Sequence, residues 1–144
     1  MKIPLDFDKE RTRVSVVASI RFESRTPIPV LFVVDTGSPV TFVDEFVSSK
    51  ARVFTKNLKF DHFALMGGTK IAVHDAGGVN IGFKGENGAL VQMPFDAMKV
   101  TKSEWKRKEA IYSSVSIIGL DFLLENKLVL YINPAKRMAY LEDM

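Results

Sequence analysis

The feature that most constrains the fold is a succession of short apolar segments, rich in β-branched and aromatic residues and separated by turn-forming residues. Such segments are typical of β-strands joined by tight turns. The segments that we interpret as strands cover residues 13–22, 28–35, 70–83 (as two strands around Ala76, Gly77 and Gly78), 88–98 and 128–142 (as a hairpin with Pro134 in its turn). Many short strands and few helices predict an all-β barrel or sandwich.

Helical patterns are few and short. Residues 44–51 predict a helix with Asp44 as its cap, and residues 120–126 predict another directly after Gly119. Residues 101–111 are compatible with a third, exposed helix. The 144 residues contain no visible repeat and can bury a sizeable core, so we expect one domain over residues 1–144.

The composition excludes several kinds of chemistry. The chain has no cysteine, which removes disulfides, thiol nucleophiles and zinc–thiolate sites. His62 and His74 are not spaced as a pair of metal ligands, so we expect no metal and no organic cofactor. No apolar run reaches the roughly 18 residues of a transmembrane helix, and the first residues lack the apolar core of a signal peptide. We therefore expect a cytoplasmic protein that does not associate with membranes.

The charge of the chain is mild, at +3 from 20 basic and 17 acidic residues. Its densest basic stretch is residues 102–109, where four basic side chains surround Trp105. A protein that binds nucleic acid usually has a broader basic stripe or a recognisable module. We interpret this stretch as a solvated face and expect no nucleic-acid partner.

An acidic residue stands at the end of the apolar run 28–35. This run is too uniformly apolar for a strand with one wet face, so we expect it to be buried on both faces. Asp35 would then lie close to the interior, where an isolated charge is costly. Thr36, Gly37 and Ser38 follow directly. Asp and Gly are both turn formers, so this pattern taken alone favours a simple turn.

A second motif changes that interpretation. Residues 116–123, SIIGLDFL, place two apolar residues before Gly119 and put Asp121 at the start of a helical pattern. Together with residues 32–38, FVVDTGS, they resemble the retropepsin-like aspartic proteases, and GLDFL is similar to the cellular, ubiquitin-shuttle type of that family. In the family, the first motif carries the catalytic aspartate and the second packs beneath its loop. The motifs occur here in the family's order, and the resemblance covers residues 13–141.

The resemblance implies an all-β, closed-barrel-like retropepsin (acid protease) fold with one or two short helices. It also implies an aspartic endopeptidase in which paired Asp35 carboxylates activate a water molecule. The chain has one Asp-Thr-Gly only, since HDAGG at 74–78 lacks both the apolar run and the hydroxyl residue. We therefore expect a homodimer with one Asp35 from each subunit at the two-fold axis. Its substrates would be peptides or proteins with apolar residues around the scissile bond.

The family's roles transfer first to the residues around Asp35. The resemblance implies that Thr36 hydrogen-bonds across the dimer and holds the two loops rigid. It implies that Gly37 permits the tight loop and leaves its carbonyl open to substrate. The hydroxyl of Ser38 would favour the ionised form of Asp35 by hydrogen bonding to it.

The second motif supplies supporting residues. The resemblance implies that Ile117 and Ile118 line or support the substrate pockets. Gly119 would allow close packing under the Asp35 loop. Asp121 is expected to start or cap the short helix, which is a structural role.

A glycine-rich hairpin that closes over the substrate, the flap, is the remaining part that the resemblance requires. Residues 64–73 can supply it, because glycine permits positive φ and close backbone approach to a ligand. The residues that we place near its tip are Met66, Gly67, Gly68 and Thr69. The pair Gly77-Gly78 is a competing position. We favour the first position because it precedes a long two-strand segment.

The sequence departs from the retroviral pattern at Pro39 and Leu120. Retroviral enzymes carry an Asp and an Arg at these positions, and the two pair with each other. Both charges are absent here, so no orphan charge remains, and only substrate anchoring by a carboxylate at position 39 is put in doubt. An alternative function is a catalytically weak or inactive dimeric module of the same fold that binds peptides or proteins.

Overall fold

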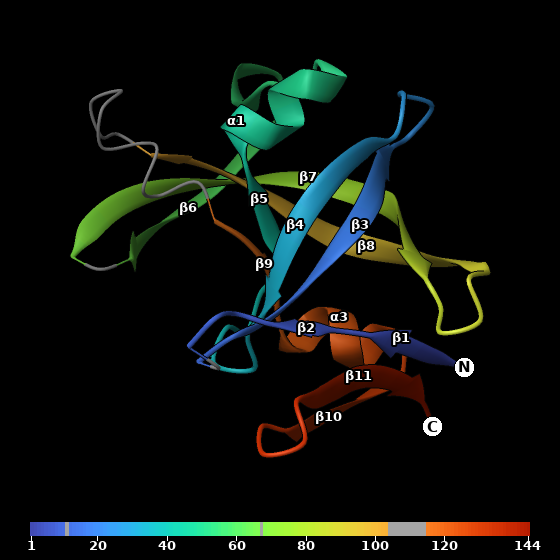
Figure 1. The fold of residues 1–144 in the computed structure, drawn as a ribbon. Helices are drawn as coiled ribbons and strands as arrows, with labels where there is room; N and C mark the ends of the chain where they lie inside the picture. The colour runs from blue at the N-terminus through green and yellow to red at the C-terminus, as the bar shows by residue number, and fades with distance from the viewer. Residues whose placement is uncertain (11, 67, 104–114) are drawn as a thin grey trace.

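The computed structural model describes residues 1–10, 12–66, 68–103 and 115–144, and its strands form two sheets (Figure 1). The strands are β1 (Lys2–Pro4), β2 (Asp6–Phe7), β3 (Val14–Phe22), β4 (Ile28–Val34), β5 (Phe42–Asp44), β6 (Lys59–Met66), β7 (Thr69–Lys84), β8 (Leu90–Ser103), β9 (Ser116–Ile118), β10 (Leu128–Asn133) and β11 (Met138–Asp143). The larger sheet has the order β2-β3-β4-β9-β5-β8-β7-β6, and β3 also pairs with β7. This additional pairing closes the strands from β3 to β7 into a barrel, which confirms the predicted fold class.

Helices are short in the described part of the chain, and none of them is long and apolar enough to cross a membrane. They are α1 (Glu45–Ser48), the 3₁₀ turns Ser49–Ala51 and Thr55–Asn57, and α3 (Leu120–Glu125). Asp44 caps α1 by accepting a hydrogen bond of 2.9 Å from the backbone N–H of Phe46. The helices predicted over 44–51 and 120–126 are therefore confirmed.

The helix predicted over 101–111 cannot start where the sequence suggested, because residues 101–103 belong to strand β8. The rest of that range lies outside the described residues, together with Trp105 and most of the basic stretch around it.

The core fills the barrel and extends beneath it to α3. Strand β3 alternates between buried and more exposed residues, since one face of a barrel strand points inward. The side chain of Phe122 on α3 is fully buried, with its ring 5.9 Å from that of Phe83 and 5.5 Å from that of Phe95. Burying one such side chain contributes about 1.5–3 kcal/mol. This cluster fixes α3 against strands β7 and β8.

The smaller sheet has the order β1-β11-β10 and brings the two ends of the chain side by side (Figure 1). Strands β10 and β11 form the hairpin predicted over residues 128–142. Ile3 and Leu141 are fully buried beneath the sheet. On its other face, the rings of Tyr131 and Tyr140 stack with their centroids 4.7 Å apart.

The prediction that the run 28–35 is buried on both faces is wrong. Strand β4 alternates, and Leu31 is 61% exposed opposite Val17, which is 62% exposed. The physical reason is that β4 lies in the wall of a barrel, with only its inner face packed on the core. Uniform apolar character does not distinguish such a strand from one that is covered on both sides.

The prediction of two strands around Ala76, Gly77 and Gly78 is also wrong. Residues 69–84 form one strand, β7, which pairs with β8 on both sides of this point. Gly77 has φ of +71°, and the register shifts between Asp75 and Val79. The glycines therefore make a bulge inside a long strand rather than a turn between two strands.

Candidate active site

Asp35 follows the last residue of β4 and continues its pairing by one step. Its backbone N–H donates a 3.0 Å hydrogen bond to the carbonyl of Ile118 in the parallel strand β9. The side chains of Asp35 and Thr36 are exposed, and Ser38 is half-buried. We expected Asp35 to lie near the interior, but in the single chain it faces solvent, because it continues the alternation of β4 and follows the inward-facing Val34 on the outer face.

The Asp35 loop, residues 35–38, is held in a tight turn by its own carboxylate. The N–H of Gly37 donates to Oδ1 of Asp35 at 2.8 Å, and the N–H of Ser38 donates to the Asp35 carbonyl at 3.1 Å. A Cβ atom at Gly37 would lie 3.1 Å from Oδ1 of Asp35. The glycine therefore keeps space open beside the carboxylate, and the turn interpretation is correct without excluding a chemical role.

The hydroxyl of Ser38 has a different partner from the one expected. It donates to the carbonyl of Val40 at 2.7 Å. A serine hydroxyl has one hydrogen to donate, so it does not also donate to Asp35. In this conformation Ser38 closes the loop rather than stabilising the charge of Asp35.

The underside of the Asp35 loop is locked by three residues, Thr41, Gly119 and Asp121. The hydroxyl of Thr41 accepts from the N–H of Gly119 at 2.9 Å and donates to Oδ1 of Asp121 at 2.6 Å. The N–H of Thr41 also donates to Oδ2 of Asp121 at 3.2 Å. We call these three residues the clamp. It joins the segment that follows the Asp35 loop to the second motif, and Thr41 is fully buried within it.

Gly119 sits where a side chain would not fit. A Cβ atom there would lie 2.4 Å from the carbonyl oxygen of Val40 and 2.6 Å from that of Ser38. The N–H of Leu120 donates to the same Ser38 carbonyl at 2.9 Å. The close packing that we predicted for Gly119 is therefore present in the structure.

The other residues of the second motif are placed by strand β9 and helix α3. Ile118 is fully buried in the core, while Ile117 faces the other way beside Val33 of β4. Asp121 does not cap α3, because the cap position is Gly119. Asp121 lies in the first turn and accepts from the N–H of Phe122 at 2.8 Å, so its larger role is in the clamp.

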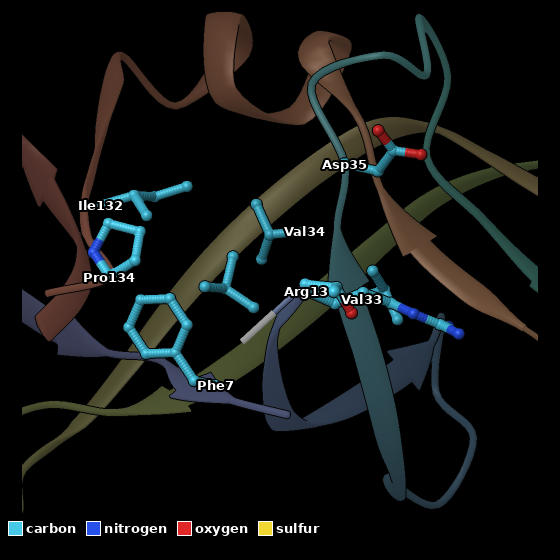
Figure 2. Close-up of a pocket in the computed structure, with 9 residues that line it drawn as sticks. Phe7, Arg13, Val33, Val34, Asp35, Ile132 and Pro134 are labelled. Carbon is cyan, nitrogen blue, oxygen red and sulfur yellow. The ribbon is translucent and has the colours of Figure 1, made fainter. Parts of the chain in front are cut away.

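A cavity of about 430 Å³ lies beside Asp35 (Figure 2). The residues that line it are Phe7, Thr12, Arg13, Val14, Val33, Val34, Asp35, Ile132 and Pro134. In Figure 2 the side chains of Phe7, Ile132 and Pro134 lie on one side of β4, and that of Arg13 extends to the other side. The lining of the cavity is mostly apolar, and Asp35 and Arg13 are its charged residues.

Sequence reasoning missed Thr41 and Arg13. Thr41 had a signal, since it is a lone hydroxyl residue within the apolar stretch 39–43. Arg13 had none, because only the pairing of β3 with β4 brings it next to Asp35.

The overall architecture was compared with solved structures. A retropepsin-like aspartic protease from Rickettsia conorii superposes with a TM-score of 0.59 and 15% sequence identity, over 97% of this chain and 98% of that chain. The chain has the retropepsin-like fold. EIAV protease in complex with the inhibitor HBY-793 matches with a TM-score of 0.46 and 12% identity, over 82% of this chain and 91% of that chain. No protein-family model matches the sequence, and no curated protein matches it.

Within this retropepsin-like fold, the two glycine pairs fall at different kinds of position. Strands β6 and β7 form a hairpin in which Met66 pairs with Thr69, and Gly68 has φ of +80° (Figure 1). Gly67 lies outside the described residues. Gly77-Gly78 lies within β7, so of the described glycines of the two pairs it is Gly68 that stands at a hairpin tip.

The described residues contain no group of three or more His, Asp or Glu side chains placed to hold a metal ion.

Proposed function

We propose that two copies of this chain form an aspartic endopeptidase, with one Asp35 from each copy at the two-fold axis. The observation that carries the proposal is the setting of Asp35. Its carboxylate faces solvent on a loop that the clamp holds from below, within a retropepsin-like fold. A carboxylate that is exposed, yet fixed in place, is available to a second copy and to a substrate.

The reaction uses the pair of carboxylates and one water molecule. Two carboxylates about 3 Å apart cannot both ionise easily, so they share one proton. The ionised Asp35 takes a proton from the water, while the protonated Asp35 of the other copy donates its proton to the carbonyl oxygen of the scissile peptide bond. The backbone hydrogen bond from Gly37 to Asp35 orients the carboxylate for both roles. No metal or organic cofactor takes part in this scheme.

Substrate binding follows from the surroundings of Asp35. Val33, half-buried next to Asp35, supports binding of apolar substrate side chains, while Ile117, its partner in β9, is only 8% exposed and supports Val33 from the neighbouring strand. The hairpin of β6 and β7 would act as the flap that covers the substrate. Its exposed Leu65, at 77%, is available to contact a ligand or the second copy.

The test is digestion of a peptide library by the wild type and by Asp35→Asn, with an aspartic-protease transition-state analogue as inhibitor. Removing one general acid–base group costs about 10²–10⁴-fold in rate, so we expect cleavage by the variant to fall by at least that factor. Because Asp35 is exposed, the free energy of unfolding of the Asp35→Asn variant should stay within about 0.5 kcal/mol of the wild-type value. Asp96→Asn, at another exposed aspartate, is the matched control and should cleave normally.

Equal cleavage by Asp35→Asn and the wild type would contradict the proposal. The mass in solution, measured alongside, should be that of a dimer. If the wild type binds the analogue as a dimer but cleaves no peptide, the alternative of a dimeric peptide-binding module is correct. The exposure of Asp35 is compatible with that alternative, since an exposed carboxylate carries little desolvation cost.

A further inference from the structure

Arg13 lies next to Asp35 through the pairing of β3 with β4. Val14 pairs with Val34 at the end of the two strands. Continuing this antiparallel register by one step puts Arg13 opposite Asp35, and opposite residues in a sheet share one face. Both side chains are exposed, and both residues border the same cavity. A guanidinium therefore stands on the face of the sheet from which Asp35 would meet its substrate.

The backbone of Arg13 is fixed, although its side chain is not. Its N–H donates to Oδ1 of Asp8 at 3.1 Å, and its carbonyl accepts from the N–H of Asp8 at 3.1 Å. These bonds join the residue after β2 to the residue before β3 and so close the loop between the two strands. The guanidinium itself makes no salt bridge with a carboxylate of the described residues.

Asp8 is the nearest candidate to neutralise Arg13, but its carboxylate has other partners. It accepts from the N–H of Thr12 at 2.7 Å and from the Thr12 hydroxyl at 2.7 Å. The hydrogen bond from the Thr12 hydroxyl is the main reason that the pKa of Asp8 is below its usual range, with a small contribution from the charge of Arg13. Asp8 therefore holds the loop together and leaves the guanidinium free for a ligand.

We infer that Arg13 binds an acidic side chain of the substrate, at one position on each side of the scissile bond. Two positions follow from the two-fold symmetry of the dimer, so the inference rests on the proposed function. An Arg guanidinium can bind a carboxylate through two parallel hydrogen bonds, which a lysine cannot reproduce. The apolar Val33 lines the same cavity as Arg13, and an apolar neighbour of this kind strengthens a charged hydrogen bond by lowering the local dielectric.

Because of the charges around Arg13, an acidic substrate side chain is favoured only where it contacts the guanidinium directly. Asp8 and Asp35 lie on either side of it along the register, and both repel a substrate carboxylate that does not reach the guanidinium. The structure therefore favours a preference at defined positions rather than a general attraction to acidic peptides.

The test uses matched peptides that carry Glu or Gln at each position around the scissile bond in turn. For the wild type we expect Glu to be favoured over Gln by at least about tenfold in kcat/KM at one position on each side, equal to about 1.4 kcal/mol. Arg13→Gln should lose this preference, and Arg13→Lys should keep part of it. The matched control is Arg21→Gln, an exposed arginine on the same face of β3 but remote from Asp35, and it should keep the wild-type preference.

Binding of the same peptides, fluorescently labelled, to the Asp35→Asn variant separates the two proposals. If the wild type cleaves peptides but the Glu-to-Gln ratio is unchanged in Arg13→Gln, the inference about Arg13 is overturned and the proposed function stands. If Arg13→Gln changes the dimer dissociation constant and leaves the ratio unchanged, Arg13 pairs with the other subunit, which also overturns it. If nothing is cleaved, the proposed function fails, and the Kd ratio between Glu and Gln peptides still decides the role of Arg13.

Discussion

Two aspartates at the ends of strands, Asp35 and Asp44, have the same local geometry but different surroundings. Asp35 comes directly after β4, and Asp44 ends β5. Each accepts a hydrogen bond from the backbone N–H two residues further along, at 2.8 Å from Gly37 and at 2.9 Å from Phe46. Locally the two carboxylates are equivalent turn formers.

Their surroundings differ completely. Asp44 is 8% exposed, and burial raises its pKa above the ordinary value of 3.8, against the opposing effect of the hydrogen bond from Phe46. Asp35 is exposed on a loop that the clamp fixes from below. A turn-forming aspartate therefore becomes a candidate for catalysis when it is exposed on a rigid support, and its own hydrogen bonds do not reveal this.

The support beneath Asp35 can be broken most directly with Gly119→Ala. The added Cβ would lie 2.4 Å from the carbonyl oxygen of Val40, so the backbone of the loop has to move. We expect a loss of about 3 kcal/mol in the free energy of unfolding, measured by urea denaturation, together with a loss of peptide cleavage.

The matched control for that change is Gly78→Ala in the bulge of β7. A Cβ there has its nearest neighbour, Oδ1 of Asp96, at 3.7 Å, which is ordinary contact. We expect a change of less than about 1 kcal/mol. A Gly119→Ala variant as stable and as active as this control would refute the claim that close packing under the loop positions Asp35.

A smaller effect should come from Thr41→Val, which keeps the shape of the side chain and removes its hydroxyl. The N–H of Gly119 then loses its acceptor, and Asp121 loses a donor, in a buried place. Leaving such groups unpaired costs about 1–3 kcal/mol. Thermal unfolding and cleavage should both report the loss, and Thr41→Ser should restore most of it. If Thr41→Ser behaves like Thr41→Val, the hydroxyl is not what matters.

The smallest effect concerns Asp44 and depends on pH. Because its folded-state pKa is raised, Asp44 contributes most to the free energy of unfolding below about pH 4, and this contribution falls as the pH rises through the folded-state pKa. Asp44→Asn keeps an equally good helix cap and does not titrate, so the stability of the wild type relative to the variant should fall as the pH rises, with the two proteins within about 1 kcal/mol of each other at neutral pH.

Urea midpoints of both proteins across this pH range give the measurement. Peptide cleavage should be unaffected by Asp44→Asn, in contrast to Asp35→Asn. If the stability of the wild type relative to Asp44→Asn rises with pH, the ionised form of Asp44 is the stabilising one. That result would contradict the contrast between the buried Asp44 and the exposed Asp35.

Much of the fold could be predicted from the sequence because its signals are local. The strands at 13–22 and 28–35, the hairpin over 128–142 and the helices at 44–51 and 120–126 follow from apolar runs rich in β-branched residues, turn residues and caps. The resemblance of the two motifs led to the retropepsin-like fold, which the structural comparison confirms. The catalytic roles assigned to Asp35 and Thr36 stay predictions.

The errors arise where pairing between distant segments decides the outcome. Leu31 is exposed because its strand lies in the wall of a barrel, and Gly77 bulges rather than turns because β8 continues past it. The partner of Ser38 and the clamp around Thr41 depend on how residues 38–41 sit against residues 119–121. No local pattern in a single sequence encodes these contacts.

Mixing subunits tests whether two copies of Asp35 make one active site. Wild type and Asp35→Asn are refolded together in equal amounts at a fixed total concentration, and the cleavage rate is compared with that of pure wild type. If each site needs two intact carboxylates, only wild-type pairs are active, and the rate should fall to about one quarter. The same mixture made with Asp96→Asn should keep the full rate. A fall to about one half with Asp35→Asn, as expected if each chain acts alone, would contradict the claim.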